Sequence, residues 1–512
     1  MTDEQADLAA GAARGEGLAG KVVAGLGWKM TSQVVLQGTR ILGAVLLARL
    51  LSPREFGLAA MVLVFAALAL VLSDVALGAA LVRRPVVTEK DRSTAFWITM
   101  IVGVCLTGAG VGLSGPIASF YGEPDVQPLL AVAALGFVVT AAGATQAALL
   151  TRAMDFRSLE LRMMAGTLLG AAVAVAVASL GYGAWAIIAQ ELTLVVVSTT
   201  IMWCLSSWRP HLVFSFGSAR ELGGFGAKVF GINLLNYASR YGDNVLIGRF
   251  LGSAALGAYA VAYNIMLLPL QRIVSPLRGV LFPAFARLQD DPVRAARGWL
   301  RANRMVGAIT IPAMLGLMVL APDFIPTVVG SQWDAAIPVV QVLAWVGLVH
   351  SLQQLNGSVL QAMDRAGTQL LFTIVSFAAA MSAFAIGLQW GIVGVAASFA
   401  VAMTLVQPVY TAATARVLGI SVLDVARSLV GVTQAAVAMA LVLLAGRAGL
   451  LEVDLPRAVR LVVLVVAGCL VYLALCRWRA PEVIDELRSF RRRRADGRAV
   501  GAGDARGSSA PA

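Results

Sequence analysis

The chain has 512 residues, of which 59% are hydrophobic and only 13% are charged, and its formal net charge is +12. A soluble domain carries about 25% charged residues, so this composition excludes an ordinary soluble protein and indicates a polytopic membrane protein. The basic residues lie in short loops and in the C-terminal tail, which is the positive-inside distribution, and we therefore expect no nucleic-acid partner.

Residues 1–20 are acidic, rich in Ala and Gly, and contain no hydrophobic run, so we expect a disordered cytosolic N-terminus and no cleavable signal peptide. The rest of the chain is a succession of apolar runs of about 20 residues, each long enough to cross ~30 Å of hydrocarbon as a helix. The fourteen predicted membrane helices are 28–50, 57–82, 94–114, 128–150, 163–180, 182–205, 224–251, 255–281, 303–321, 335–361, 368–387, 391–415, 425–446 and 458–476.

The charges of the connecting loops alternate. With the N-terminus inside, every predicted cytosolic loop carries Arg or Lys, whereas most predicted outer loops carry neither. The exceptions are Arg54 and the last outer loop, which contains Arg447 and Arg457. This alternation predicts an even number of crossings with both termini in the cytosol.

A segment near the N-terminus recurs 200 positions later in the chain. Residues 49–60, which read RLLSPREFGLAA, correspond to residues 249–260, which read RFLGSAALGAYA. The same offset pairs three upstream polar residues with three others: Gln33 with Asn233, Thr39 with Ser239, and Arg40 with Arg240. Such a repeat predicts two homologous lobes facing each other across a pathway.

Weaker matches extend the repeat toward the C-terminus. Ala153-Met154-Asp155 recurs as Ala362-Met363-Asp364 at an offset of 209, and residues 181–186 resemble residues 391–396 at an offset of 210. We therefore predict an all-α polytopic membrane protein with about fourteen transmembrane helices, in two homologous six-helix lobes plus two C-terminal helices. The predicted divisions are an N-lobe at 21–223, a C-lobe at 224–420, the two added helices at 421–476 and a basic, disordered cytosolic tail at 477–512.

Polar side chains inside the predicted helices are the main functional candidates, because inserting a charge costs at least ~2.5 kcal/mol. In the first and seventh helices these side chains follow a helical period, so each set forms one stripe. Two repeat-related stripes fit the two walls of one polar cavity. The candidate substrate-binding residues are Arg40, Arg240, Gln33, Gln37, Asn233, Asn236, Asn244 and Arg272, and the ion-coupling candidates are Asp74, Asp243 and Glu191.

Two further expectations concern these charges. Arg240 and Asp243 are three residues apart on one helix, so we expect them to pair, which would leave Arg40 more available to an anionic substrate. Polar residues in membrane bundles also bond neighbouring helices to one another, for ~0.6 kcal/mol on average, and this structural alternative stays open for every candidate.

Motifs of soluble enzymes are missing from the sequence: we find no P-loop, dinucleotide fingerprint, nucleophile elbow or His/Cys metal cluster. The four cysteines, at 105, 204, 469 and 476, lack metal-ligand spacing and are expected to be free thiols. We therefore expect no enzyme activity, no cofactor and no metal. Transport would have to run on an ion gradient, the membrane potential or the substrate gradient.

Four strings carry a family resemblance: LARLLSPREFGLAAMVLVF at 47–65, LLTRAMDFRSLELR at 149–162, GYGAWAIIAQEL at 181–192, and RYGDNVLIGRFLGSAALGAYAVAYNI at 240–265. In combination they resemble the polysaccharide flippases of the multidrug/oligosaccharidyl-lipid/polysaccharide exporter superfamily. The resemblance covers about residues 20–475.

The resemblance implies a protein of the bacterial cytoplasmic membrane that moves an oligosaccharide linked to undecaprenyl diphosphate to the outer leaflet. It implies alternating access of two lobes around a cationic cavity, while the prenyl tail stays in the lipid. The implied partners are the lipid-linked oligosaccharide, a coupling ion (H⁺ or Na⁺), membrane lipids and the polysaccharide polymerase machinery. Arg40 and Arg240 suit a diphosphate by charge and fork geometry.

Other functions compete with this interpretation. A drug exporter of the same superfamily would need acidic lumen residues, and a glycan polymerase would need a large outer loop, whereas the stripes are mainly cationic and amide and the outer loops are short. A lipid II flippase also has fourteen helices and a cationic cavity. That flippase, the ion-coupled drug exporter and a non-transporting scaffold stay open as alternatives.

Overall fold

The structure is a computed structural model, and it describes residues 32–33, 35–73, 81, 87–215, 237, 240–270, 284–453, 455–483 and 486. Over these ranges the regular secondary structure is helical and no β-strand occurs, which confirms the all-α class predicted from composition. The chain divides into two compact units, Met1–Ala260 and Val261–Ala512, which we describe separately.

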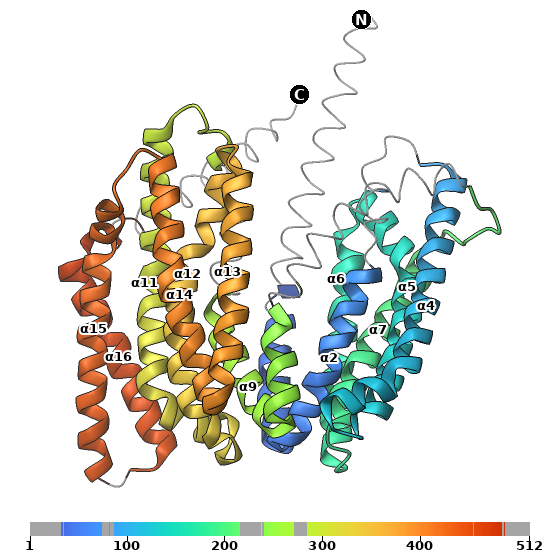
Figure 1. Ribbon diagram of the computed structural model, residues 1–512, viewed down its shortest axis with the longest axis horizontal. Coiled ribbons are helices and arrows are strands. Elements are labelled where there is room, and N and C mark those ends of the chain that lie inside the picture. The colour runs from blue at the N-terminus through green and yellow to red at the C-terminus, as the bar shows by residue number, and fades with distance from the viewer. Residues whose placement is uncertain are drawn as a thin grey trace, which may run out of the picture. The chain divides into compact units, whose positions relative to one another are not determined.

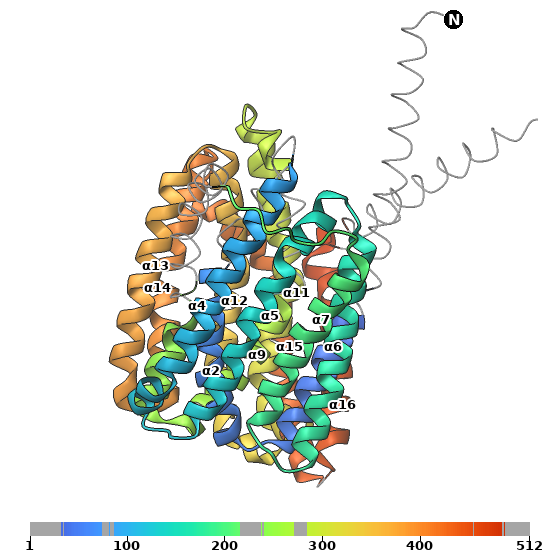
Figure 2. The same cartoon turned by 90° about the vertical axis from the view of Figure 1, so that its right-hand side faces the viewer.

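The first unit is built of long helices joined by short turns (Figure 1). Helices that follow one another in the chain pack in pairs, α4 against α5 and α6 against α7. Helix α5 also contacts α7 and α2 (Figure 2). In chain order its helices are 35–50, α2 (Pro53–Ser73), α4 (Glu89–Tyr121), α5 (Val126–Arg152), α6 (Phe156–Ser179), α7 (Trp185–Leu205), 240–251 and the beginning of α9 (Ser253–Pro269).

The second unit repeats this construction. Here α11 packs against α12 and α15, α13 packs against α14, and α15 packs against α16. Its elements after α9 are α11 (Pro292–Phe324), η2 (Ile325–Val329), η3 (Ser331–Ala336), α12 (Ile337–Ala362), α13 (Ala366–Gly387), η4 (Leu388–Trp390), α14 (Gly391–Val417), α15 (Val422–Glu452) and α16 (Arg457–Arg479).

Local sequence signals set the ends of several helices. Thr88 and Asp91 form a capping box at the start of α4, and Ser421 and Asp424 form another at the start of α15. In each box the two side chains satisfy backbone N–H groups that the first helical turn leaves without partners. Gly122 ends α4 with φ 71°, a left-handed conformation that costs glycine little.

Nine helical stretches among the described residues are long and apolar enough to cross a membrane, and one of them, Ala366–Val417, contains both α13 and α14. The protein is therefore a multi-pass membrane protein. Each of the fourteen predicted segments overlaps a described helix, but the number of crossings stays a prediction. Some helices exceed their predicted span: α4 begins before residue 94 and continues past residue 114, to a length of about 50 Å.

The repeat is visible in the backbone at one helix corner of each unit. Met154 and Asp364, 210 positions apart, are the two non-glycine residues with positive φ in the described chain, at 54° and 55°. The N–H of Asp155 donates to the Leu150 carbonyl, and the N–H of Arg365 donates to the Leu360 carbonyl in the same way. The structural register here is thus 210, so the offset of 209 taken from the Ala-Met-Asp strings is wrong by one residue.

The first compact unit extends past residue 223, where the repeat predicts the end of the N-lobe. Tyr237 and helix 240–251 pack against α2 and α4: the Tyr237 hydroxyl donates to the Val64 carbonyl at 2.8 Å, and the Arg249 guanidinium lies 5.5 Å from the centre of the Phe120 ring. Compact units are defined by packing, whereas the repeat is defined by sequence duplication, so the two kinds of boundary need not coincide. The predicted lobe boundaries therefore stay a prediction.

Two of the three arginines that break the charge alternation, Arg54 and Arg447, have acidic neighbours. Arg54 lies 3.1 Å from Glu123 and 3.0 Å from Asp125. Arg447 donates to the buried Asp323 at 2.6 Å, and Asp323 also accepts from Arg460. These carboxylates lie in predicted outer loops or at their edges, so the unexpected arginines are partly neutralised by ion pairs.

Candidate functional site

A pocket of about 260 Å³ opens in the first unit between α2, α5, α7 and helix 240–251. Its walls are mainly apolar, and Glu191 of α7 is the one charged side chain among the residues that line it. Thr140 of α5 and Tyr241 add polar atoms to the same walls. A mostly apolar concavity with a few convergent polar groups is the usual form of a ligand site.

Glu191 is the charged group of this pocket, and Arg40 on helix 35–50 acts on it from outside the lining. Glu191 is exposed within the pocket, and Arg40 lies within electrostatic range of its carboxylate without a hydrogen bond or salt bridge between these two described residues. Two residues that the sequence places 151 positions apart thus influence each other electrostatically in the folded bundle. Arg40 was predicted to bind substrate and Glu191 to couple an ion. The positive charge of Arg40 favours the ionised form of Glu191.

Arg240 and Asp243 do not form the predicted ion pair, although the structure describes both residues. Asp243 is only 3% exposed; it accepts the Asn244 N–H at 2.7 Å and lies beside the phenol of Tyr259. Arg240 is exposed, with its guanidinium 5.9 Å from the centre of the Tyr241 ring. The rotation of the helix places Asp243 in the packed interior. Arg240 therefore does not pair with Asp243 and is exposed, as Arg40 is.

The remaining candidates divide between described and undescribed residues. Gln33 is exposed, and Gln37 and Asn244 are half-buried. Asn233, Asn236, Arg272 and Asp74 lie outside the described residues, so their roles stay predictions.

Sequence reasoning missed the tyrosines of this site. The rings of Tyr237 and Tyr241 lie 5.1 Å apart and one helical turn apart, on the helix that carries Arg240. Their spacing of four residues, which continues the polar stripe from Asn233, was the signal that could have identified them.

Two glycines that the repeat relates lie in contact where α2 crosses α9. Gly57 in α2 and Gly257 in α9 cross so closely that a Cβ on Gly57 would stand 3.1 Å from the Gly257 nitrogen, and one on Gly257 would stand 3.0 Å from the Gly57 nitrogen. Each added Cβ would also overlap a carbonyl of the other helix, at Ser253 and Pro53 respectively. Only glycine at both positions permits this reciprocal contact.

Glu123, in the turn after α4, connects the same two helices. It accepts a hydrogen bond from the Ser253 hydroxyl at 2.5 Å, at the start of α9, and it pairs with Arg54 at the start of α2. One carboxylate therefore connects the end of α4 with the starts of α2 and α9.

Among the residues that the structure describes, no three His, Cys, Asp or Glu side chains gather where they could hold a metal ion. The four cysteines are free, and Cys476 alone among them is buried.

The fold is that of a known class of membrane transporter. A solved structure of the lipid II flippase MurJ, in an inward closed conformation, superposes with a TM-score of 0.69 over 89% of this chain and 100% of that chain. The sequences are only 14% identical, so this likeness concerns the fold alone.

The sequence places the chain more narrowly. It belongs to the family described as polysaccharide biosynthesis protein, which it matches over residues 46–338. It is 30% identical over 382 residues to the lipopolysaccharide biosynthesis protein WzxC of Escherichia coli (strain K12), covering 74% of this chain and 78% of that relative. The teichuronic acid biosynthesis protein TuaB of Bacillus subtilis (strain 168) is 28% identical over 384 residues, covering 72% and 79%. The family predicted from the four strings is thereby confirmed.

Proposed function

We propose that this protein is a flippase that moves an oligosaccharide linked to undecaprenyl diphosphate from the cytosolic to the outer leaflet of the bacterial cytoplasmic membrane. The observation that carries the proposal is the pocket of the first unit, which Glu191 lines within electrostatic range of Arg40, in a chain of the polysaccharide biosynthesis family. Both termini are proposed to lie in the cytosol, as the loop charges predict.

The site chemistry suits a sugar diphosphate. Arg40 and Arg240 are both exposed, and a guanidinium donates two parallel hydrogen bonds to phosphate oxygens. The Tyr237 and Tyr241 rings provide flat apolar faces next to Arg240, against which the C–H faces of a sugar can pack. Arginines would hold the diphosphate, and the tyrosines the first sugar.

Glu191 would couple this binding to protons. A charged Glu191 attracts Arg40 and competes with the diphosphate for it, whereas a protonated Glu191 releases the guanidinium. Proton binding and substrate binding then favour each other, as linkage requires. The Gly57–Gly257 crossing would seal the outer side during loading and separate when the glycan leaves.

The test is a leaflet assay in a strain that lacks the gene. Complementation with Arg40→Ala or Arg240→Ala should leave the lipid-linked oligosaccharide mostly in the cytosolic leaflet, with transport reduced at least about 10-fold, since each loses a charge-assisted contact of ~1.5–3 kcal/mol. The matched control is Arg427→Ala, which removes an exposed arginine from α15 and should transport normally.

Normal transport by both cavity variants, at equal membrane expression, would contradict the cationic cavity. An unchanged lipid-linked pool in the deletion strain would instead contradict the flippase, and rescue of a lipid II flippase depletion would favour that alternative.

A further inference from the structure

The chain after α7 forms a strap, which we define as residues 208–215, across the first turns of α4. The His211 N–H donates to the Ser93 hydroxyl at 3.2 Å, and the Trp97 indole donates to the His211 carbonyl at 2.9 Å. The Ser215 N–H donates to the Thr94 hydroxyl at 3.0 Å. Three hydrogen bonds thus fix both ends of the tripeptide 212–214 on one helix.

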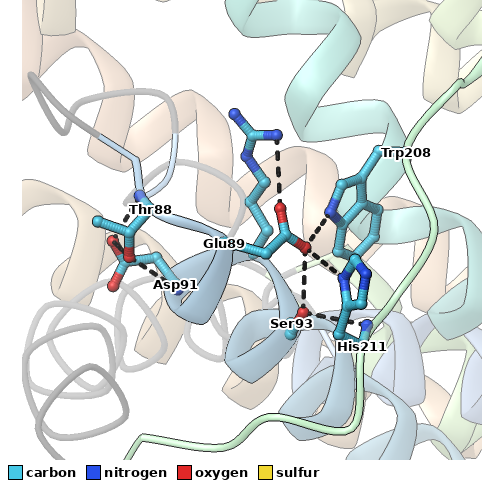
Figure 3. Close-up of polar contacts among 7 residues, drawn as sticks. Thr88, Glu89, Asp91, Ser93, Trp208 and His211 are labelled. Atoms are coloured by element: carbon cyan, nitrogen blue, oxygen red, sulfur yellow. Dashed lines mark hydrogen bonds and ion pairs between the residues drawn. The ribbon is translucent and has the colours of Figure 1, made fainter.

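Glu89 holds the strap at a fourth point (Figure 3). Its carboxylate accepts the Trp208 indole N–H at 2.7 Å and lies 2.9 Å from Nδ1 of His211. Arg92 lies 3.8 Å from the same carboxylate. Glu89 is therefore occupied by strap contacts, and the strap is a fixed structure over this length.

The strap lies over a face of α4 that is exposed farther along the helix. Ile101 and Val104 are exposed on α4, and Trp97 and Thr94 continue their stripe toward the helix start at spacings of three and four residues. An exposed apolar stripe on a membrane helix faces lipid. The strap thus covers the cytosolic end of a lipid-facing surface, because α4 begins on the predicted cytosolic side.

The strap presents apolar side chains outward. Leu212 is 91% exposed, and its neighbours Val213 and Phe214 are also exposed. The N–H and carbonyl of His211 and the N–H of Ser215 are bonded to α4, so the backbone on both sides of the tripeptide is held against that helix.

An exposed cation and several indoles lie near this tripeptide. Lys90 is exposed and lies one turn before Thr94 on the same stripe. Arg209 donates to the carbonyls of Trp203, Ser206 and Trp208, so it fixes the strap to the end of α7. The nearby carboxylates are engaged elsewhere, Glu89 with the strap and Asp91 in the capping box. Trp97, Trp203 and Trp208 gather around Phe96, with ring centres 5.4 to 6.2 Å from it, as in an interfacial aromatic belt.

We propose that the strap is a binding site for anionic phospholipid in the cytosolic leaflet. Leu212, Val213 and Phe214 insert at the boundary between headgroups and acyl chains, and Lys90 contacts the lipid phosphate. Charge complementarity selects an acidic headgroup, and the apolar tripeptide sets the depth. The proposal depends on the topology and not on the transported glycan.

The first test measures depth. A spin label on Leu212→Cys, in a background without the four native cysteines, is compared with one on Asp290→Cys, an exposed cytosolic turn position, in vesicles of phosphatidylcholine and phosphatidylglycerol. At position 212 collisions with dissolved oxygen should exceed those with a water-soluble nickel complex, and at 290 the order should reverse. Equal, water-like behaviour at both positions would overturn the insertion.

The second test measures headgroup preference through the Tm of the purified full-length protein in detergent. Added phosphatidylglycerol should raise Tm more than phosphatidylcholine does. Lys90→Gln should remove a substantial part of this difference, Lys90→Arg should keep it, and Leu212→Ser with Phe214→Ser should lower the response to both lipids. The matched control is Leu180→Ser, an exposed leucine in a predicted outer turn, which should change neither response. An equal Tm rise with the two lipids in the unaltered protein would overturn the anionic site.

Discussion

At the residue scale the pair of Arg40 and Glu191 carries the most chemistry. Each side chain alone would be costly inside a membrane, and their mutual attraction reduces that cost. The same attraction makes the arginine's availability depend on the protonation of the carboxylate. A structural salt bridge would hold Arg40 constantly, whereas the structure describes Arg40 as exposed and without a salt bridge to Glu191, so an anion can compete for it.

Glu191→Gln should bind undecaprenyl diphosphate more tightly than the unaltered protein at neutral pH, by about 10-fold, which is ~1.4 kcal/mol. The unaltered protein should bind more tightly as pH falls, because protonation of Glu191 frees Arg40, and the variant should lose this dependence. Equilibrium binding at two pH values measures both effects.

Asp290→Asn, which removes an exposed cytosolic carboxylate, serves as the control and should retain the pH dependence. If Glu191→Gln binds undecaprenyl diphosphate no more tightly and keeps the pH dependence of binding, Glu191 has a structural role instead.

At the element scale the crossing of α2 and α9 explains why the repeat preserves a glycine in each copy. Backbones that approach this closely exclude water and lipid without any side chain between them. The adjacent Glu123 ties the starts of both helices to the turn after α4. Separation of these ends would break that carboxylate's contacts and expose the glycine backbones, so the two features would open together.

Gly257→Ala should keep the outer ends of α2 and α9 apart, because overpacking such a contact typically costs ~1–3 kcal/mol. We expect a membrane-impermeant maleimide to label Thr140→Cys in the pocket faster from outside in this variant, and transport to fall. Labelling rates on intact cells measure the opening.

The control for that experiment is Gly112→Ala on α4, where an added Cβ meets no atom within 4 Å. Unchanged labelling in Gly257→Ala, with the protein still in the membrane, would show that the crossing is not the seal.

At the scale of the whole molecule the proposed orientation rests on charge. The outer positions of Arg54 and Arg447 are compatible with it because both are paired with carboxylates. The two compact units each contain helices long enough to span a bilayer, and their corners at Met154 and Asp364 share one backbone geometry.

Single cysteines at Asp125 and Asp334, both exposed, should react with an impermeant maleimide added outside intact cells. A cysteine at Asp290 should react only after the membrane is permeabilised. Protection of both outer positions in intact cells would overturn the topology and, with it, the leaflet assigned to the strap.

The sequence by itself determined the class, the helices and the family. Hydropathy and loop charge act locally, since a helix spans a bilayer by its own length and orients by its own flanks, so these properties could be predicted without packing. The strings around Arg49 and Arg249 identified the repeat and the polysaccharide biosynthesis family, which the comparisons confirmed.

Tertiary structure alone decided which side chains meet. The predicted Arg240–Asp243 pair has the right spacing, but the rotation of its helix buries Asp243 beside Tyr259 instead. The electrostatic interaction of Arg40 with Glu191, the glycine crossing and the strap over α4 involve residues far apart in sequence. Such contacts depend on how helices rotate and cross when they pack, and no periodicity within one helix encodes that.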